Sequence, residues 1–379
     1  MSIIIPANSA VGGGYDVANG VRFDDGSSSN FTDGSAPGGN RQKFTWSAWF
    51  KRSSVGATQI LASSSYSGSD EGYLFLSGGG VLGWQSTNGG DGNLGTNMVW
   101  RDLSAWYHVV FSVDTTQSTA TNRIKLYVNG SQYTWDNSTT QPNVNQSLYF
   151  NVGGSYNSYI GRRAGGDYFD GYMSEIVFID NAQLAADSFG EFDSDSGVWK
   201  PLESVADLTF GTSGYYLNFQ NSSALGTDVS GVGNTFTANN LAAIDQTTDT
   251  CTNNFATMNP LDNFYYNGVF TEGNLKIING SGREAGATST FAISNGKWFW
   301  EAKPKSNVAP VIGIQSVPSA ANTSSSASMQ VNGYGYLKTG KVETSNGSGG
   351  STVLATYATY AADDIIGVAV DLDGNKIYF

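Results

Sequence analysis

Short runs of alternating apolar and small polar residues constrain the fold of this chain more than any other feature. In the run FTWSAWFK, Phe44 and Trp46 fall on one side of an extended backbone, and Thr45 falls on the other side. The same alternation recurs in WYHVVFSVD, IKLYVNG and GKWFWEAKP, whereas helical spacing of apolar residues is almost absent. These runs predict an all-β protein of antiparallel strands that bury one face.

The composition supports strands that are joined by many turns. Of 379 residues, 48 are glycine, and aromatic residues are as frequent as charged ones, at 13% each. Strands favour aromatic side chains, and tight turns favour glycine and asparagine. Asn129 and Gly130 follow the run IKLYV, so we expect a hairpin turn there. A chain of this length exceeds one ordinary hydrophobic core, which predicts two domains.

Charge and hydropathy exclude two classes of partner. The formal net charge is −13, which disfavours a grip on nucleic-acid phosphates. The N-terminal residues MSIIIPANSA lack the basic and apolar regions of a signal peptide. No stretch approaches the about 20 apolar residues that span a bilayer. We therefore expect neither nucleic-acid binding nor membrane insertion, and synthesis without a signal peptide.

Changes in the strand pattern suggest four parts of the chain. Strand-like runs fill residues 20–200 after an N-terminal segment, 1–19, and they resume in residues 263–379. Between them, residues 201–262 are polar and irregular, although YYLNF (215–219) has the character of a strand. We therefore predict two β-sandwiches that are separated by a linker or junction.

Two local signals refine this division. The run NAQLAADSFGEF (181–192) is predicted to form the one short helix, with Asp180 or Asn181 as its cap. Near the C-terminus, the run DGN (373–375) predicts a hairpin whose second strand ends at Phe379. A hairpin at the last residue suggests a truncated second sandwich, so we expect further strands beyond it.

The order of several segments resembles known families. The segments FTWSAWFKR, WYHVVFSVD, NRIKLYVNG, YIGRR and FDGYMSEIVFIDNAQL resemble laminin-G-like, concanavalin-A-type lectin sandwiches. The segments GKWFWEAKP, IGIQS, YGY and DDIIGVAVDLDGNKIYF resemble SPRY domains. The resemblance implies a jelly roll followed by a SPRY-like sandwich.

The tandem of the two parts is similar to structural proteins of marine tailed phages, cyanophage-like and pelagiphage-like. The connecting runs SFGEFDSDSGVWKPL and TNNFATMNPLDN belong to this resemblance. It implies a protein of the virion, made in the host cytoplasm, whose partners are other virion proteins and a host cell-surface glycan. A homo-oligomer is expected, and a trimer would suit a fibre.

The residues that could perform catalysis are few. Glu191, Asp193 and Asp195 approach the carboxylate spacing of glycoside hydrolases, but the final Glu of that pattern is missing. We therefore expect a solvated acidic loop there. His108 is the only histidine and Cys251 the only cysteine, which disfavours a catalytic triad, a zinc site and a disulfide. We predict that the chain is not an enzyme and that His108 makes a structural hydrogen bond.

Calcium is the one cofactor that the sequence leaves open. The resemblance to laminin-G-like sandwiches implies a calcium site at the rim, where carboxylates and backbone carbonyls converge. The candidate ligands are Asp24, Asp25, Asp70, Glu71 and Asp170.

Aromatic residues in Gly/Asn/Ser-rich surroundings are candidates for stacking on sugar rings. We expect these to be Trp84, Trp100, Tyr156 and Tyr159, with burial in a core as the alternative for each. Core positions are instead expected for Trp46, Trp298 and Trp300, which lie within strand-like runs.

These expectations favour a fibre or appendage subunit that adheres to a host-surface glycan without catalysis. Many copies on one particle would raise a weak single-site affinity. A capsid-surface decoration or cement protein is the first alternative, and a polysaccharide depolymerase is the second.

Overall fold

The computed structural model describes residues 14–34, 37–66, 70–87, 90–136, 140–265, 268–279, 285–305, 310–315, 333–345 and 351–379. Within these ranges the chain is all-β, as predicted, and its helices are short 3-10 turns. These turns are η1 (Asp25–Ser27), η2 (Ala120–Asn122), η3 (Ala186–Ser188), η4 (Glu203–Asp207) and η5 (Ala243–Asp245). Among the described residues, no helix is long and apolar enough to span a bilayer.

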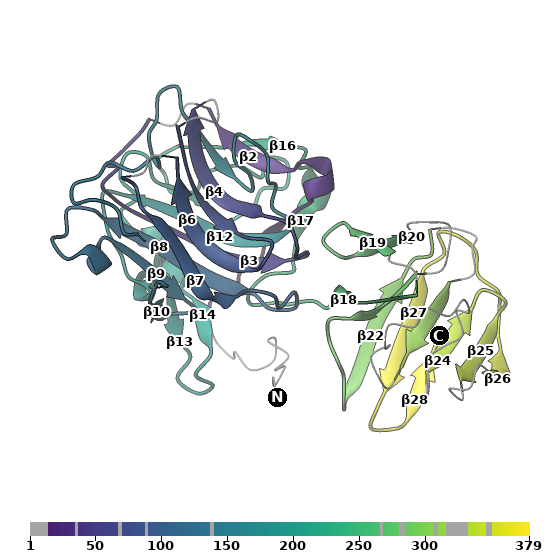
Figure 1. Cartoon of the computed structure of the whole chain (residues 1–379). Coiled ribbons are helices and arrows are strands. Elements are labelled where there is room, and N and C mark those ends of the chain that lie inside the picture. The colour runs from purple at the N-terminus through teal and green to yellow at the C-terminus, as the bar shows by residue number, and fades with distance from the viewer. Residues whose placement is uncertain are drawn as a thin grey trace. The chain divides into compact units, whose positions relative to one another are not determined.

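The chain forms two compact units (Figure 1). The first comprises Met1–Thr257 and Thr271–Lys276, and the second comprises Met258–Phe270 and Ile277–Phe379.

The first unit contains two antiparallel sheets. The larger sheet, sheet A, has the order β10-β9-β8-β3-β12-β1-β17, and β15 also pairs with β12. Its strands are β1 (Gly20–Phe23), β3 (Lys43–Arg52), β8 (Tyr107–Asp114), β9 (Ile124–Val128), β10 (Ser131–Tyr133), β12 (Gly171–Asp180), β15 (Tyr215–Leu217) and β17 (Gln246–Thr247).

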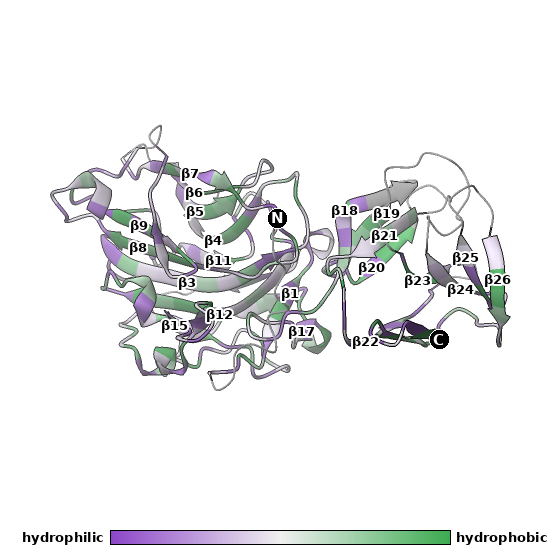
Figure 2. Ribbon diagram, turned by 90° about the horizontal axis from the view of Figure 1, so that it is seen from below, coloured by the Kyte–Doolittle hydropathy of each residue, from purple (hydrophilic) through white to green (hydrophobic). Residues whose placement is uncertain are grey.

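The second sheet of this unit, sheet B, has the order β16-β2-β11-β4-β5-β6-β7. Its strands are β2 (Asn30–Asp33), β4 (Gln59–Tyr66), β5 (Asp70–Leu76), β6 (Val81–Ser86), β7 (Asn93–Val99), β11 (Asn157–Ile160) and β16 (Thr237–Asn239). Figure 2 shows hydrophobic and hydrophilic residues interleaved along these strands. Residues of both sheets, among them Trp46, Phe111 and Leu74, meet in one hydrophobic core. The predicted sandwich therefore arises because each strand turns its apolar face inwards.

Sequence patterns located the central strands and one turn correctly. Trp46 of β3 lies opposite Phe111 of β8 and Phe178 of β12, so the alternating runs become neighbours in sheet A. Asn129 and Gly130 both have positive φ, at 44° and 82°, and join β9 to β10 as the predicted hairpin.

The stretch 201–262 is not a linker, which corrects the sequence prediction. Its residues up to Thr257 belong to the first unit, where β15 pairs with β12, β16 with β2 and β17 with β1. These strands are only two or three residues long, too short to display an alternating pattern. Tyr215 and Leu217 of β15 join the main core, whereas Tyr216, with Phe189 and Val205, packs in a second cluster on the outer face of sheet A.

The predicted helix at 181–192 is also absent. Asp180 ends β12, Asn181 has a φ of 64°, and only η3 is helical before β13 (Gly190–Phe192), which pairs with β14 (Trp199–Pro201). The hydroxyl of Thr45 donates to the Ala182 carbonyl and accepts from the Leu184 amide. This extended attachment to β3 competes with helix formation.

The second unit contains two larger sheets and two two-stranded sheets. The larger sheets have the orders β22-β27-β28 and β23-β24-β25-β26, and the two-stranded sheets are β18-β21 and β19-β20. The strands are β18 (Met258–Tyr265), β19 (Gly268–Thr271), β20 (Lys276–Asn279), β21 (Ala285–Ser289), β22 (Lys297–Ala302), β23 (Val311–Ile314), β24 (Tyr334–Leu337), β25 (Lys341–Ser345), β26 (Ser351–Thr356), β27 (Ile366–Asp371) and β28 (Lys376–Tyr378). The predicted hairpin at 373–375 joins β27 to β28.

A small core holds this unit together. Val368 and Val370 of β27 meet Tyr336 of β24 in it. Trp300 packs against this core, whereas the indole of Trp298 is partly exposed and donates to the Asn295 carbonyl. Along β22 and β27 the more buried and the less buried side chains thus alternate, as the sequence pattern predicts.

Candidate functional site

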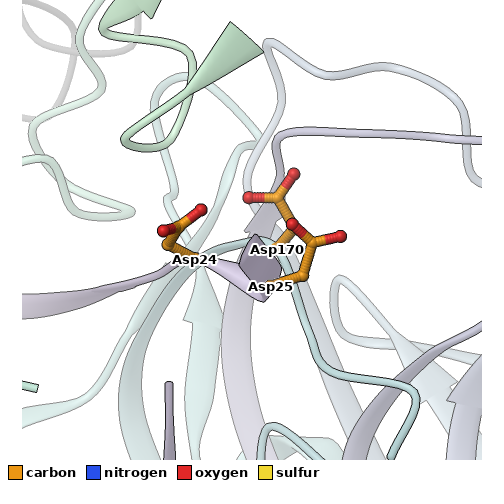
Figure 3. Close-up of side chains that lie close together, drawn as sticks. All are labelled: Asp24, Asp25 and Asp170. Carbon is orange, nitrogen blue, oxygen red and sulfur yellow. The ribbon is translucent and has the colours of Figure 1, made fainter. Parts of the chain in front are cut away.

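Three of the predicted calcium ligands converge at one end of β1. Asp24 follows β1, Asp25 opens η1, and Asp170 precedes β12. Because β1 and β12 are antiparallel and Phe23 lies opposite Gly171, the end of one strand is next to the start of the other. One carboxylate oxygen from each aspartate lies within 4.8 Å of the others, and Figure 3 shows these side chains grouped at the strand end. We call these residues the acidic trio.

Backbone groups and serine hydroxyls hold the turn that carries Asp24 and Asp25. The Asp24 carbonyl accepts hydrogen bonds from the Ser29 amide at 3.2 Å and from the Ser27 hydroxyl at 3.0 Å. The Ser29 hydroxyl accepts from the Asp24 amide at 2.7 Å. Ser28 closes η1 with a φ of 61°. Backbone groups and serine hydroxyls thus fix the shape of this turn.

The electrostatics of the trio favour a bound cation. Asp170 is only 8% exposed, and burial together with the charge of Asp25 raises its pKa to about 7. Burial and the charge of Asp24 also raise the pKa of Asp25. Carboxylates that crowd in this way repel one another, and a divalent cation with oxygen ligands would offset the repulsion. The donor set therefore fits calcium.

The other two predicted calcium ligands lie elsewhere, which corrects the five-residue set. Glu71 is buried, its carboxylate lies 3.2 Å from the Arg163 guanidinium, and it accepts a hydrogen bond from the Ala164 amide. Asp70 accepts a hydrogen bond from the Tyr156 hydroxyl at 3.2 Å. Both belong to β5 in sheet B, and neither joins the trio among the described residues.

Two of the four predicted sugar-stacking residues are core residues. Trp84 of β6 is 0% exposed, its ring stacks on Phe111, and its indole N–H donates to the Asp91 carbonyl. A side chain at Gly72 would lie 2.6 Å from the Trp84 ring, so the nearby glycine makes room for the indole. Trp100 is likewise buried, and its N–H donates to the Thr96 hydroxyl. Neither ring is available to a ligand.

The two predicted tyrosines remain partly exposed and have different partners. Tyr156 contacts Tyr66 at a ring distance of 5.3 Å and stacks on Tyr149 at 6.2 Å. Tyr159 carries the guanidinium of Arg162 over its ring at 4.9 Å. Tyr156 therefore belongs to an aromatic cluster, whereas an arginine already covers one face of the Tyr159 ring.

The acidic run at Glu191 forms a turn rather than a catalytic pair. Asp193 accepts hydrogen bonds from the amides of Asp195 and Ser196, which lowers its pKa to about 2. Lys200 lies 3.2 Å from Glu191 and 3.4 Å from Asp193. The charges are thus paired locally in a loop.

His108 is a buried structural residue. Its Nε2 lies 2.8 Å from the Ser47 hydroxyl, and its Nδ1 accepts a hydrogen bond from the Trp199 indole at 3.0 Å. Burial lowers its pKa to about 3, so the ring is neutral at physiological pH. Both ring nitrogens already have partners, as expected for a strand histidine that supports packing.

Comparison with known proteins agrees with this architecture. Residues 23–187 match the family model Laminin_G_3, described as the concanavalin A-like lectin/glucanases superfamily. No curated protein matches the chain.

Similar solved structures include a pentraxin of Limulus polyphemus, at 17% identity and a TM-score of 0.33 over 45% of this chain and 80% of that one. A putative carbohydrate-binding protein of Bacteroides ovatus has 16% identity and a TM-score of 0.33 over 46% of each chain. Domains LG4-5 of the mouse laminin α1 chain have 13% identity and a TM-score of 0.35 over 97% of this chain and 76% of that one. Likenesses this distant carry no argument about function. The family match and the jelly-roll architecture together identify a laminin G, concanavalin A-like lectin domain in the first part of the chain.

Proposed function

We propose that this protein binds a host-surface glycan without catalysis, as a fibre or appendage subunit of a phage virion. The observation that carries the binding role is the acidic trio, which lies in a domain of lectin type. The virion assignment is supported by the resemblance of the tandem segments to phage structural proteins. The same resemblance supports a SPRY-like sandwich as the second unit.

Calcium would complete the binding site. Asp24, Asp25 and Asp170 would hold the ion, which would offer coordination to sugar hydroxyls when it is bound. The residues themselves supply negative charge at a fixed turn, and the Ser54 hydroxyl orients Asp170 by a hydrogen bond.

Adhesion by such a site depends on copy number. A site that contacts one or two sugar rings binds weakly, but linked copies raise the effective concentration and hence the avidity. We propose a homo-oligomer, a trimer in the case of a fibre, that contacts other virion proteins and presents several identical domains to the host.

Binding is tested with the purified chain on an array of bacterial surface polysaccharides, in calcium chloride or in EDTA. We expect binding only with calcium, and a calcium affinity about tenfold weaker in Asp25→Asn by isothermal titration, because one ligand charge is removed. Asp16→Asn, an exposed aspartate outside the trio, is the matched control. Equal calcium affinity in Asp25→Asn and the wild type would reject the trio as the calcium site.

The place on the particle needs a second experiment. Cryo-electron microscopy of the virion should locate the protein on a tail appendage. Density on the head lattice would instead identify a decoration protein. New reducing ends after incubation with polysaccharide would identify a depolymerase and contradict binding without catalysis.

A further inference from the structure

A groove on the first unit lies away from the acidic trio. It has a volume of about 440 Å³ and is lined by residues of β9, η3 and the hairpin β13-β14. Figure 1 shows β9 close to β13 and β14. We call it the Trp199 groove, and the residues that carry the argument are Tyr127, Gly130, Asp187, Glu191, Phe192 and Trp199. Its volume falls in the range of small-molecule sites in proteins.

The indole of Trp199 is held in one orientation. Its N–H donates to Nδ1 of His108 at 3.0 Å, and its ring stacks on the imidazole at 5.9 Å. The imidazole in turn stacks on Trp49 at 4.7 Å and meets the Ser47 hydroxyl. Since His108 is buried and neutral, its Nδ1 stays an acceptor. The buried His108 therefore positions an aromatic ring of the groove.

Two glycines fit closely against the edges of this indole. A Cβ at Gly130 would lie 2.2 Å from Cε3 of Trp199, and a Cβ at Gly190 would lie 2.5 Å from its Cζ2. Any other residue at these positions would displace the ring. The backbone thus clamps the indole while the ring remains partly exposed.

A second aromatic ring extends the surface. Phe192 is 54% exposed and meets Trp199 edge-on, with ring centroids 4.9 Å apart. An exposed phenyl ring beside a preorganised indole offers an apolar contact area that water solvates poorly. Such a surface suits the C–H face of a sugar ring.

The polar groups at the groove suit an uncharged ligand that carries hydroxyl groups. Burial and the charge of Asp187 raise the pKa of Tyr127, so its hydroxyl remains a donor. The carboxylates of Asp187 and Glu191 are acceptors, and Lys200 lies 3.2 Å from Glu191. Because two carboxylates face a single lysine, the net charge at the groove is negative and repels an acidic sugar.

We propose that the Trp199 groove binds a neutral sugar ring, stacked on Trp199 and Phe192 and hydrogen-bonded to Asp187 or Glu191. It is separate from the acidic trio, because β8, β3 and β12 lie between β9 and β1 in sheet A. The groove therefore adds a second contact to the proposed glycan binding, and it requires no calcium.

Saturation-transfer NMR and calorimetry with neutral glucose, galactose and mannose trisaccharides test this groove, in EDTA throughout. We expect saturable binding of at least one trisaccharide and an affinity at least about tenfold lower in Phe192→Ala, because an exposed stacking contact is removed. Val198→Ala is the matched control, since it is exposed on the same hairpin but does not line the groove. Asp187→Asn should weaken binding without loss of the fold.

Three results would contradict the proposal that the Trp199 groove binds a neutral sugar. These are no binding of any trisaccharide in EDTA, equal affinity in Phe192→Ala and the wild type, and equal affinity for an oligosaccharide of glucuronic acid. If the wild type binds glycan with calcium but binds no trisaccharide in EDTA, the proposed function stands and only the groove is rejected. If the wild type shows neither kind of binding, both proposals are rejected.

Discussion

The two units bury their strands to different extents, although both follow the same alternating pattern. In the first unit every residue of β12 is buried, because the core covers one face and the segment after β12 covers the other. In the second unit β22 alternates between exposed and half-buried side chains, and Phe299 is 66% exposed. The comparison teaches that alternation identifies the inward face but does not say whether a second layer will cover the outward one.

Polar anchors hold that covering layer on the first unit. Lys51 on β3 is buried and lies 2.5 Å from Asp249, and it donates to Asn254 as well. Trp106 donates to the other oxygen of Asp249. A buried ion pair with several hydrogen bonds fixes position more than it adds stability. The following predictions test how far the two units differ, beginning with the largest effect.

Removal of a buried indole should destabilise the first unit most. Trp84→Ala should lower its free energy of unfolding by roughly 3–5 kcal/mol, through lost burial and a remaining cavity. Urea unfolding, followed by near-ultraviolet circular dichroism, measures the change. The matched control in the second unit is the exposed Phe299→Ala, which should change stability by no more than about 0.5 kcal/mol. Equal effects of the two variants would contradict the difference in burial.

Removal of the buried Lys51–Asp249 ion pair should detach the segment that covers the outer face of sheet A. Lys51→Met leaves the Asp249 carboxylate buried without its cation, which costs roughly 3–5 kcal/mol. We expect the lower end of that range, because Trp106 still donates to Asp249. Hydrogen exchange should accelerate in residues 246–254 before it does so in β8. A double variant, Lys51→Met with Asp249→Asn, should recover part of the loss, and no recovery would show that the pair does not act as a unit.

The buried carboxyl of Glu175 should make the first unit less stable as pH rises. Burial raises its pKa to about 7 from an ordinary value of 4.5, so the folded state binds more protons than the unfolded state between these values. The protonated state is therefore favoured in the fold, and about 3 kcal/mol of stability is lost as pH rises from 4.5 through 7.

His108 also titrates over this pH range in the unfolded chain, so the pH dependence of the wild type alone does not isolate Glu175. The test therefore compares Glu175→Gln with the wild type. The stability difference between the two proteins should change by about 3 kcal/mol from pH 4.5 to 7 in favour of Glu175→Gln. A constant difference would show that Glu175 has an ordinary pKa in the fold.

A core substitution in the second unit should have a smaller effect that is confined to that unit. Val368→Ala removes two methyl groups at a fully buried position, for a loss of about 2 kcal/mol. Differential scanning calorimetry should show a lower transition for the second unit and an unchanged one for the first. A shift of both transitions would mean that the two units unfold together.

The acidic trio was within reach of the sequence, whereas the buried tryptophans were not. Asp170 lies in the segment FDGYMSEIVFIDNAQL that the sequence singled out, whereas Asp24 follows β1, which no pattern indicated, and antiparallel pairing of β1 with β12 brings the two aspartates together. Trp84 lies in a glycine-rich stretch that resembles a loop, but the glycines there make room for its ring. Only the packed structure distinguishes a glycine that forms a turn from one that accommodates a neighbour.

The covering layer and the Trp199 groove also lay beyond the sequence. The run YYLNF indicated β15, but β16 and β17 are short, and the partners of all three strands are distant in the chain, so no local pattern reveals their pairing. Trp199, Gly130 and Asp187 come from separate elements that meet only in the fold. Both Asn-Gly chemistry and strand alternation are local signals, and local signals predicted the local elements well.

The position of β1 has a consequence for synthesis of the protein. This strand lies between β12 and β17, and the nearby Val17 bonds to Thr250 and Thr252. Contacts this distant in sequence close slowly. The earliest strand of the first unit therefore has no partner on the ribosome until β12 has been made, and its second neighbour, β17, is added only once the chain has passed residue 247.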